Sequence, residues 1–208
     1  GEVMSASIAG GDDSRDTTSS ADAPSDEELM LRVQHDDFAA FEELYRRFEG
    51  RMLGYYARLT YDRALAEDYT QDVFTRLWGA RHLYRPTGRF INYIYQIARN
   101  HWINENKRRV NRPDAAALDG MLPFAETAHR DDQPLTSVLR DELVERIERA
   151  LREIPEEQRE VFVLSRYQQL RYQEIADIMG IPVRTVESRL VLATRKLMAK
   201  LSTFRKLD

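Results

Sequence analysis

The stretch of sequence that decides the fold lies near the C-terminal end, where residues 174–190 read EIADIMGIPVRTVESRL. Ala176 is small at a position where two helices would cross closely, and Gly180 permits a left-handed helix end. Pro182 suits the first turn of a following helix, on which Val186 would face inward. This spacing predicts a helix-turn-helix, and the second helix of such a motif enters the major groove of DNA.

The other residues near the start of this second helix carry groups that can read DNA. Arg can pair with guanine through two hydrogen bonds, Glu can accept one from cytosine, and Ser or Thr can contact bases or phosphates. The alternative interpretation is an ordinary helical hairpin with a charged, solvated face. The full pattern favours DNA binding. The residues that we assign to duplex DNA are Arg184, Thr185, Glu187, Ser188 and Arg189.

The rest of the chain predicts further helices. Ser25 opens a capping box with a Glu three residues later, and Asp62 can cap another helix. Apolar residues recur every three or four positions, and no segment of useful length alternates with a period of two. We therefore expect an all-α fold of two small helical domains joined by an extended linker. Helices are predicted after Ser25, Asp62 and Pro155, and over residues 38–59, 90–109, 139–154, 172–179 and 183–204.

Charge is distributed unevenly along the chain. The 208 residues carry a formal net charge of −4, which by itself argues against a nucleic-acid partner. Residues 25–75, however, hold six basic and twelve acidic side chains, whereas residues 76–112 hold nine basic and one acidic. A polar acidic tail, predicted to be disordered, is assigned to residues 1–24. The two helical domains are assigned to residues 25–112 and 137–208, and an acidic linker with three prolines is assigned to residues 113–136.

Composition and motif content exclude several classes of protein. The chain has no Cys, which excludes disulfides and thiolate sites. No apolar run approaches the roughly 18 residues needed to span a bilayer, and no signal-peptide pattern is present, so we expect a cytoplasmic protein without membrane insertion. The four His are scattered without metal-ligand spacing, and no phosphate-binding Gly loop occurs. We expect no enzymatic activity, no metal site and no cofactor.

Aromatic and basic side chains alternate through residues 76–112, a mixture that suits single-stranded DNA. Each base can stack on an aromatic ring for about 1 to 3 kcal/mol, while cations follow the phosphates. The alternative is that many of these apolar side chains form a core, and we prefer it for Phe90, Ile94 and Ile97. For Arg99, Asn100 and the basic run 107–109, which fall largely off that apolar stripe, a nucleic-acid role is the better interpretation.

A known family resembles this chain over residues 66–78, which read AEDYTQDVFTRLW. Phe90 and the run 97–100 follow at the distance found in that family. Together with the helix-turn-helix, this ordered set resembles the extracytoplasmic-function (group 4) subfamily of bacterial sigma-70 factors in its two-domain form. The resemblance covers about residues 26–201. It implies a dissociable RNA polymerase subunit that recruits the enzyme to promoters and opens the DNA without bond chemistry of its own.

The resemblance also implies roles for individual residues and partners. A docking surface for the clamp helices of the largest polymerase subunit is implied at Asp68, Gln71, Asp72, Thr75 and Arg76. Recognition and melting of the minus-ten element are implied at Tyr84, Arg85, Arg89, Tyr95, Gln96, Arg99, Asn100, Asn104, Lys107, Arg108 and Arg109. The helix-turn-helix would read the minus-thirty-five element as a duplex, near the flap of the second-largest subunit. The linker would follow the RNA exit path, and an anti-sigma factor is a further expected partner.

A different class of function is also open. A regulator that binds duplex DNA as a dimer would carry the same helix-turn-helix, but its N-terminal half should be a sensor or receiver domain. The all-helical, basic and aromatic character of that half argues against this class. Three residues depart from those more common in the resembling family, namely Asn104, Arg184 and Glu187. Promoter preference is therefore expected to differ.

Overall fold

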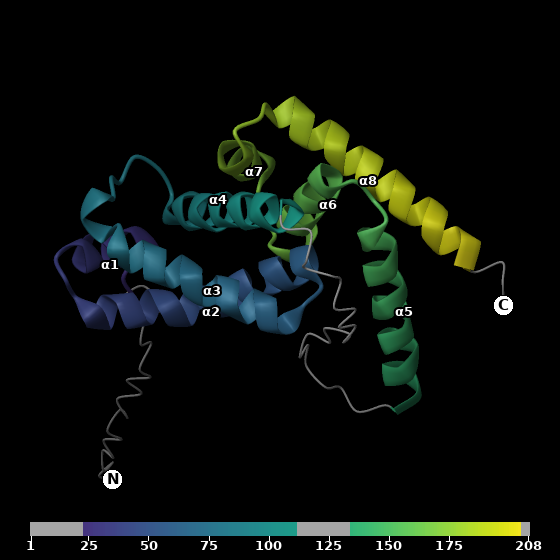
Figure 1. Cartoon of the computed structure of the whole chain (residues 1–208), viewed down its shortest axis with the longest axis horizontal. Coiled ribbons are helices and arrows are strands. Elements are labelled where there is room, and N and C mark those ends of the chain that lie inside the picture. The colour runs from purple at the N-terminus through teal and green to yellow at the C-terminus, as the bar shows by residue number, and fades with distance from the viewer. Residues whose placement is uncertain (1–22, 112–133, 205–208) are drawn as a thin grey trace, which may run out of the picture.

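The computed structural model describes residues 23–111 and 134–204, and within these ranges every regular element is a helix (Figure 1). The predicted all-α fold is confirmed. In this part of the chain, no helix is long and apolar enough to cross a membrane. The elements are α1 (Asp26–Gln34), α2 (Phe38–Thr60), α3 (Arg63–Gly79), the 3₁₀ turn η1 (Arg81–Leu83), α4 (Phe90–Val110), α5 (Pro134–Arg152), α6 (Glu156–Phe162), the π-helical turn η2 (Val163–Tyr167), α7 (Tyr172–Met179) and α8 (Val183–Phe204).

Helix starts follow the capping residues in the sequence. Ser25 Oγ accepts a hydrogen bond from the Glu28 amide at 3.2 Å, and the Glu28 carboxylate accepts one from the Ser25 amide at 2.7 Å. The carboxylates of Asp37 and Asp62 cap α2 and α3 by accepting from the amides of Ala40 and Leu65. Each cap of this kind contributes about 1 kcal/mol to helix stability. Only α5 begins clearly earlier than predicted, because Pro134 forms its first turn, where a proline needs no amide hydrogen.

The N-terminal unit, comprising α1 to α4, is a helical bundle. In Figure 1, α2 and α3 lie side by side, and α4 lies between this pair and α7. The bundle core is fully buried and mixes aliphatic and aromatic side chains. Its largest members are Leu29, Met30, Leu44, Met52, Tyr55, Tyr56, Leu77, Tyr84, Phe90, Ile94 and Tyr95.

The C-terminal unit comprises α5 to α8 and contains the predicted helix-turn-helix in α7 and α8. Gly180 has φ +65°, and its amide donates to the Ala176 carbonyl oxygen, which ends α7. Val186 and Leu190 of α8 are buried, as the sequence predicts. A separate small core joins α5 to α8 through Ala150, Leu151, Ile154, Ala193 and Leu197.

The two units pack directly against each other. Buried side chains of α2 and α4 belong to the same hydrophobic cluster as those of α6, η2 and α7. Arg58 of α2 stacks on the ring of Tyr167 at 3.8 Å, and Arg152 of α5 lies 4.4 Å above the ring of Tyr61. The helix-turn-helix is thus held against the bundle, with α7 across α4 (Figure 1).

The turn of the helix-turn-helix gives a direct stability test. Gly180→Ala should lower the free energy of unfolding by about 1 to 2 kcal/mol, because an L side chain is disfavoured at positive φ. Gly50→Ala is the matched control: it lies inside α2 with no atom within 4 Å of the added Cβ, so it should raise stability by about 0.5 to 1 kcal/mol. Urea unfolding followed by circular dichroism measures both. Equal responses of the two glycines would contradict this account.

Candidate nucleic-acid interface

One exposed face of α3 gathers the five residues for which a docking role is predicted. Asp68, Gln71, Asp72, Thr75 and Arg76 are all exposed. The opposite face of α3 is buried in the bundle through apolar side chains at helical spacing. The structure therefore brings all five together on one exposed surface.

A buried histidine lies under this face. His101 of α4 packs edge-on against the ring of Tyr69 at 4.8 Å, and its Nε2 lies 3.2 Å from Asp72 Oδ2 without the geometry of a hydrogen bond. Burial, assisted by the nearby guanidinium of Arg76, lowers the pKa of His101. The imidazole is thus kept neutral, and it joins the docking face to α4.

Most residues predicted to contact single-stranded DNA lie on the surface, along α4 and the loop before it. The C-terminal turns of α4 expose a cluster of cations at a helix end, where the helix dipole favours positive charge. One member, Arg108, pairs with Glu105 of the same helix at 2.5 Å. The exposed members are Arg85, Arg89, Asn100, Asn104, Lys107, Arg108 and Arg109.

Two predicted DNA contacts lie inside the protein instead. Tyr84 is 2% exposed and packs against the ring of Tyr93 at 5.0 Å. Tyr95 is fully buried, and its hydroxyl donates to Gln168 Oε1 of the C-terminal unit at 2.7 Å. In this conformation neither ring can stack on a base.

Three further residues that were predicted to contact DNA bind acceptors of the C-terminal unit. Arg99 Nε donates to Glu160 Oε1 at 3.0 Å. Gln96 Nε2 donates to the Asp177 carbonyl oxygen at 3.2 Å. Arg89, although exposed, forms an ion pair with Glu174. These side chains therefore point to protein acceptors from α6 and α7.

The residues predicted to read duplex DNA occupy the first turns of α8. Arg184, Glu187 and Ser188 are exposed, and Thr185 is half-buried. Arg189 pairs with Glu157 of α6 at 2.5 Å, and its own side chain is 22% exposed. Four of the five are thus free to meet a DNA surface.

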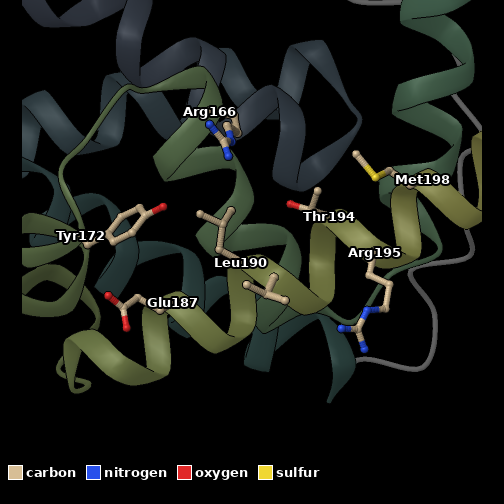
Figure 2. A pocket seen from close by; sticks show the side chains of 8 residues that line it. Arg166, Tyr172, Glu187, Leu190, Thr194, Arg195 and Met198 are labelled. Carbon is tan, nitrogen blue, oxygen red and sulfur yellow. The ribbon is translucent and has the colours of Figure 1, made fainter.

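An apolar groove runs beside these residues, along the middle of α8, and sequence reasoning did not predict it. Its volume is about 600 Å³. Figure 2 shows the side chains that line it. Val191 and Met198 are exposed in it, at 55% and 66%. The signal in the sequence is a run of apolar residues after the turn, at 190–193. Its lining residues are Arg166, Tyr172, Glu187, Leu190, Val191, Thr194, Arg195 and Met198.

No group of three His, Asp or Glu side chains in the described residues could hold a metal ion. The candidate site consists of three surfaces: the exposed face of α3, the basic end of α4 and the helix-turn-helix.

Comparisons with known proteins find matches to both units of the chain. Residues 44–112 match the family model described as sigma-70 region 2, and residues 144–197 match sigma-70, region 4. The RNA polymerase sigma-H factor of Pseudomonas aeruginosa is 31% identical over 172 residues, covering 81% of this chain and 89% of the relative. The ECF RNA polymerase sigma-E factor of Haemophilus influenzae is 29% identical, covering 87% of this chain and 97% of the relative.

A solved structure shares the fold. It contains the sigma factor RpoE of Bartonella quintana in complex with the anti-sigma factor NepR. The TM-score is 0.63, with 19% sequence identity, over 78% of this chain and 96% of that chain.

The buried histidine predicts an acid-sensitive stability. The folded-state pKa of His101 lies below the ordinary value of 6.5. The contribution of His101 to the free energy of unfolding is therefore fully present above pH 6.5 and is lost as the pH falls through the folded-state pKa. The free energy of unfolding should therefore fall more between pH 7 and pH 5 in the wild type than in His101→Gln. Urea titrations across this range test it, with His82→Gln at an exposed position as control. Parallel pH profiles for wild type and His101→Gln would refute the assignment.

Proposed function

The chain belongs to the extracytoplasmic-function subfamily of sigma-70 factors, RNA polymerase subunits that direct transcription initiation, and from this premise we propose which partner each of its surfaces binds. The proposal assigns polymerase docking to α3, minus-ten DNA to α4 and the preceding loop, and the minus-thirty-five element to α8. The single observation that carries it is a difference in charge: the exposed face of α3 holds Asp68 and Asp72 against one cation, Arg76, whereas the exposed end of α4 is basic. The protein acts in the cytoplasm in this proposal.

Polymerase docking is assigned to the five exposed residues of α3, and their partner is the pair of clamp helices of the largest polymerase subunit. Asp68 and Asp72 lie one turn apart beside Gln71, so carboxylates and an amide are presented together. Such a face repels DNA phosphates and suits a protein partner with basic side chains. This supports docking rather than DNA binding on α3.

Minus-ten recognition is assigned to the exposed basic and amide side chains of α4 and the 85–89 loop. Lys107, Arg108 and Arg109 would follow phosphates, while Asn100 and Asn104 can read bases. Tyr84, which lies beneath the loop, would support it from within rather than stack on a base.

Minus-thirty-five recognition is assigned to Arg184, Thr185, Glu187 and Ser188 at the start of α8, with Arg189 joining them once it leaves Glu157. The apolar groove along α8 is assigned to the flap of the second-largest polymerase subunit. An amphipathic helix laid in such a groove would bury the exposed side chains of Val191 and Met198.

We also propose an anti-sigma factor as a partner. The Bartonella quintana relative is in complex with one. Both units of this chain expose large apolar side chains, with Phe38 at 57% and Leu83 at 75% on one and Met198 at 66% on the other. Full activity of the chain when it is expressed without other genes of its operon would count against this partner.

Paired substitutions separate polymerase docking from promoter opening. Asp68→Ala with Gln71→Ala should weaken binding to core RNA polymerase by about tenfold or more, because each lost contact with a charged group costs about 1.5 to 3 kcal/mol. Arg108→Ala with Arg109→Ala should leave that affinity unchanged and reduce promoter opening. Polymerase affinity is measured by fluorescence anisotropy, and opening by permanganate footprinting. If both pairs lost polymerase affinity equally, the division of the N-terminal unit into two surfaces would fail.

A further inference from the structure

Three buried hydrogen-bond donors without partners meet where α2, α5 and α6 come together. They are the hydroxyl of Tyr61, which follows α2, and the Nε–H groups of Arg152 at the end of α5 and of Arg159 in α6. None of the three atoms has a hydrogen-bond partner in the described part of the chain. Buried polar groups in native proteins nearly always have partners, so an unpaired set in one place indicates a missing water or ion.

The ring of Tyr61 brings the two guanidinium groups together. The Cζ atom of Arg152 lies 4.4 Å from the ring centroid, and that of Arg159 lies 5.4 Å from it. Tyr61 ends α2 in the left-handed conformation, with φ +56° and its amide donating to the Ala57 carbonyl oxygen. The helix end therefore fixes the direction in which this side chain leaves the backbone.

Positive charge exceeds negative charge at this junction. Burial raises the pKa of Glu148 on α5, and the guanidinium groups of Arg58 and Arg152 oppose that effect. Three cations, the third being Arg159, thus share one buried carboxylate, and within the described ranges no carboxylate forms an ion pair with Arg152 or Arg159. A water molecule can satisfy a single donor, but two neighbouring cations favour an anion.

The donor set has the chemistry that binds a phosphoryl group. A guanidinium presents a planar fork of N–H groups that matches the oxygens of phosphate, and a phosphoryl group carries a charge of about −1.5 to −2 at neutral pH. The side chains of Tyr61, Arg152 and Arg159 are half-buried, so a small solute can reach them. Because two guanidinium groups already lie against the ring of Tyr61, the ring is not available to stack on a base.

Acidic residues beside these arginines disfavour a long polyanion. Glu153 follows Arg152, and Glu156 and Glu157 begin α6, and all three carboxylates belong to exposed residues. A nucleic-acid strand carries charges along its whole length and would be repelled by these carboxylates. A small phosphorylated molecule would present its charge at one point only.

We propose that Tyr61, Arg152 and Arg159 form a binding site for the phosphoryl group of a small anion, which is either inorganic or part of a nucleotide. None of the three residues is assigned to polymerase or to promoter DNA, so the site is independent of the proposed function. Tyr61 belongs to one unit and the two arginines to the other. A bound anion therefore stabilises the packing of α5 and α6 against the end of α2.

Isothermal titration of the full chain tests the site, in phosphate-free buffer at constant ionic strength. The probes are inorganic phosphate, pyrophosphate and ATP. The wild type should bind at least one of them, and its unfolding temperature should rise with the concentration of that anion. Tighter binding of ATP than of pyrophosphate would identify a nucleotide as the ligand, and equal or weaker binding would identify an inorganic anion.

Two variants remove the proposed contacts. Arg152→Gln with Arg159→Gln should weaken anion binding by about tenfold or more, because hydrogen bonds to charged groups are lost. Tyr61→Phe keeps the ring and removes only the hydroxyl, so it should fold as the wild type does and bind the anion several-fold more weakly. The second variant keeps the test decisive if the first does not fold.

The matched control is Arg46→Gln with Arg149→Gln, which removes the same charge. Both arginines are exposed and pair with a glutamate on their own helix. The control should bind the anion as tightly as the wild type does. If it lost affinity as the Arg152 and Arg159 variant does, the response would be one to overall charge, and the site would not exist.

The remaining outcomes are equally direct. Absence of binding to all three anions, or equal binding by the wild type and the Arg152 and Arg159 variant, would overturn the inference. Binding of a single-stranded oligonucleotide through these two arginines, in preference to the small anions, would make nucleic acid the ligand and overturn it as well. Failure of the wild type to bind polymerase would instead overturn the proposed function and leave this site unaffected.

Discussion

One buried carboxylate connects the two units at their centre. Glu160 accepts hydrogen bonds from Arg99 of α4 and Tyr55 of α2, so one side chain of α6 is bound to two helices of the bundle. Burial raises the pKa of Glu160, and the guanidinium of Arg99 opposes that effect. Removal of one partner from such a buried pair costs about 3 to 5 kcal/mol, because the remaining charge is uncompensated. The pair therefore specifies the docked arrangement more than it adds stability.

Local features of the fold were predictable from the sequence, whereas the contact between units was not. The cap at Ser25 and the left-handed helix end at Gly180 depend on residues within one turn, and short-range pattern is enough to find them. Glu160, by contrast, lies in a charged helix and would be expected on a solvated face. Its partners are 61 and 105 residues away in sequence, a separation that no periodicity encodes.

The site was predictable to the extent that a side chain's role follows from helix geometry. The spacing of Asp68, Gln71 and Asp72 places them on one face of α3, and the structure exposes all three. Tyr84 and Tyr95 show where that reasoning stops. In the sequence, an aromatic residue that stacks on a base looks the same as one that fills a core, because both are apolar residues in a basic segment. Only the burial of Tyr84 and Tyr95 in the folded protein distinguishes the two roles.

The same burial that holds the units together also makes them separable. Taking Glu160 out of water has a cost that offsets most of its attraction to Arg99, and opening the units returns the carboxylate to water. The buried pair thus specifies how the two units pack, but it contributes only a modest net free energy to their association.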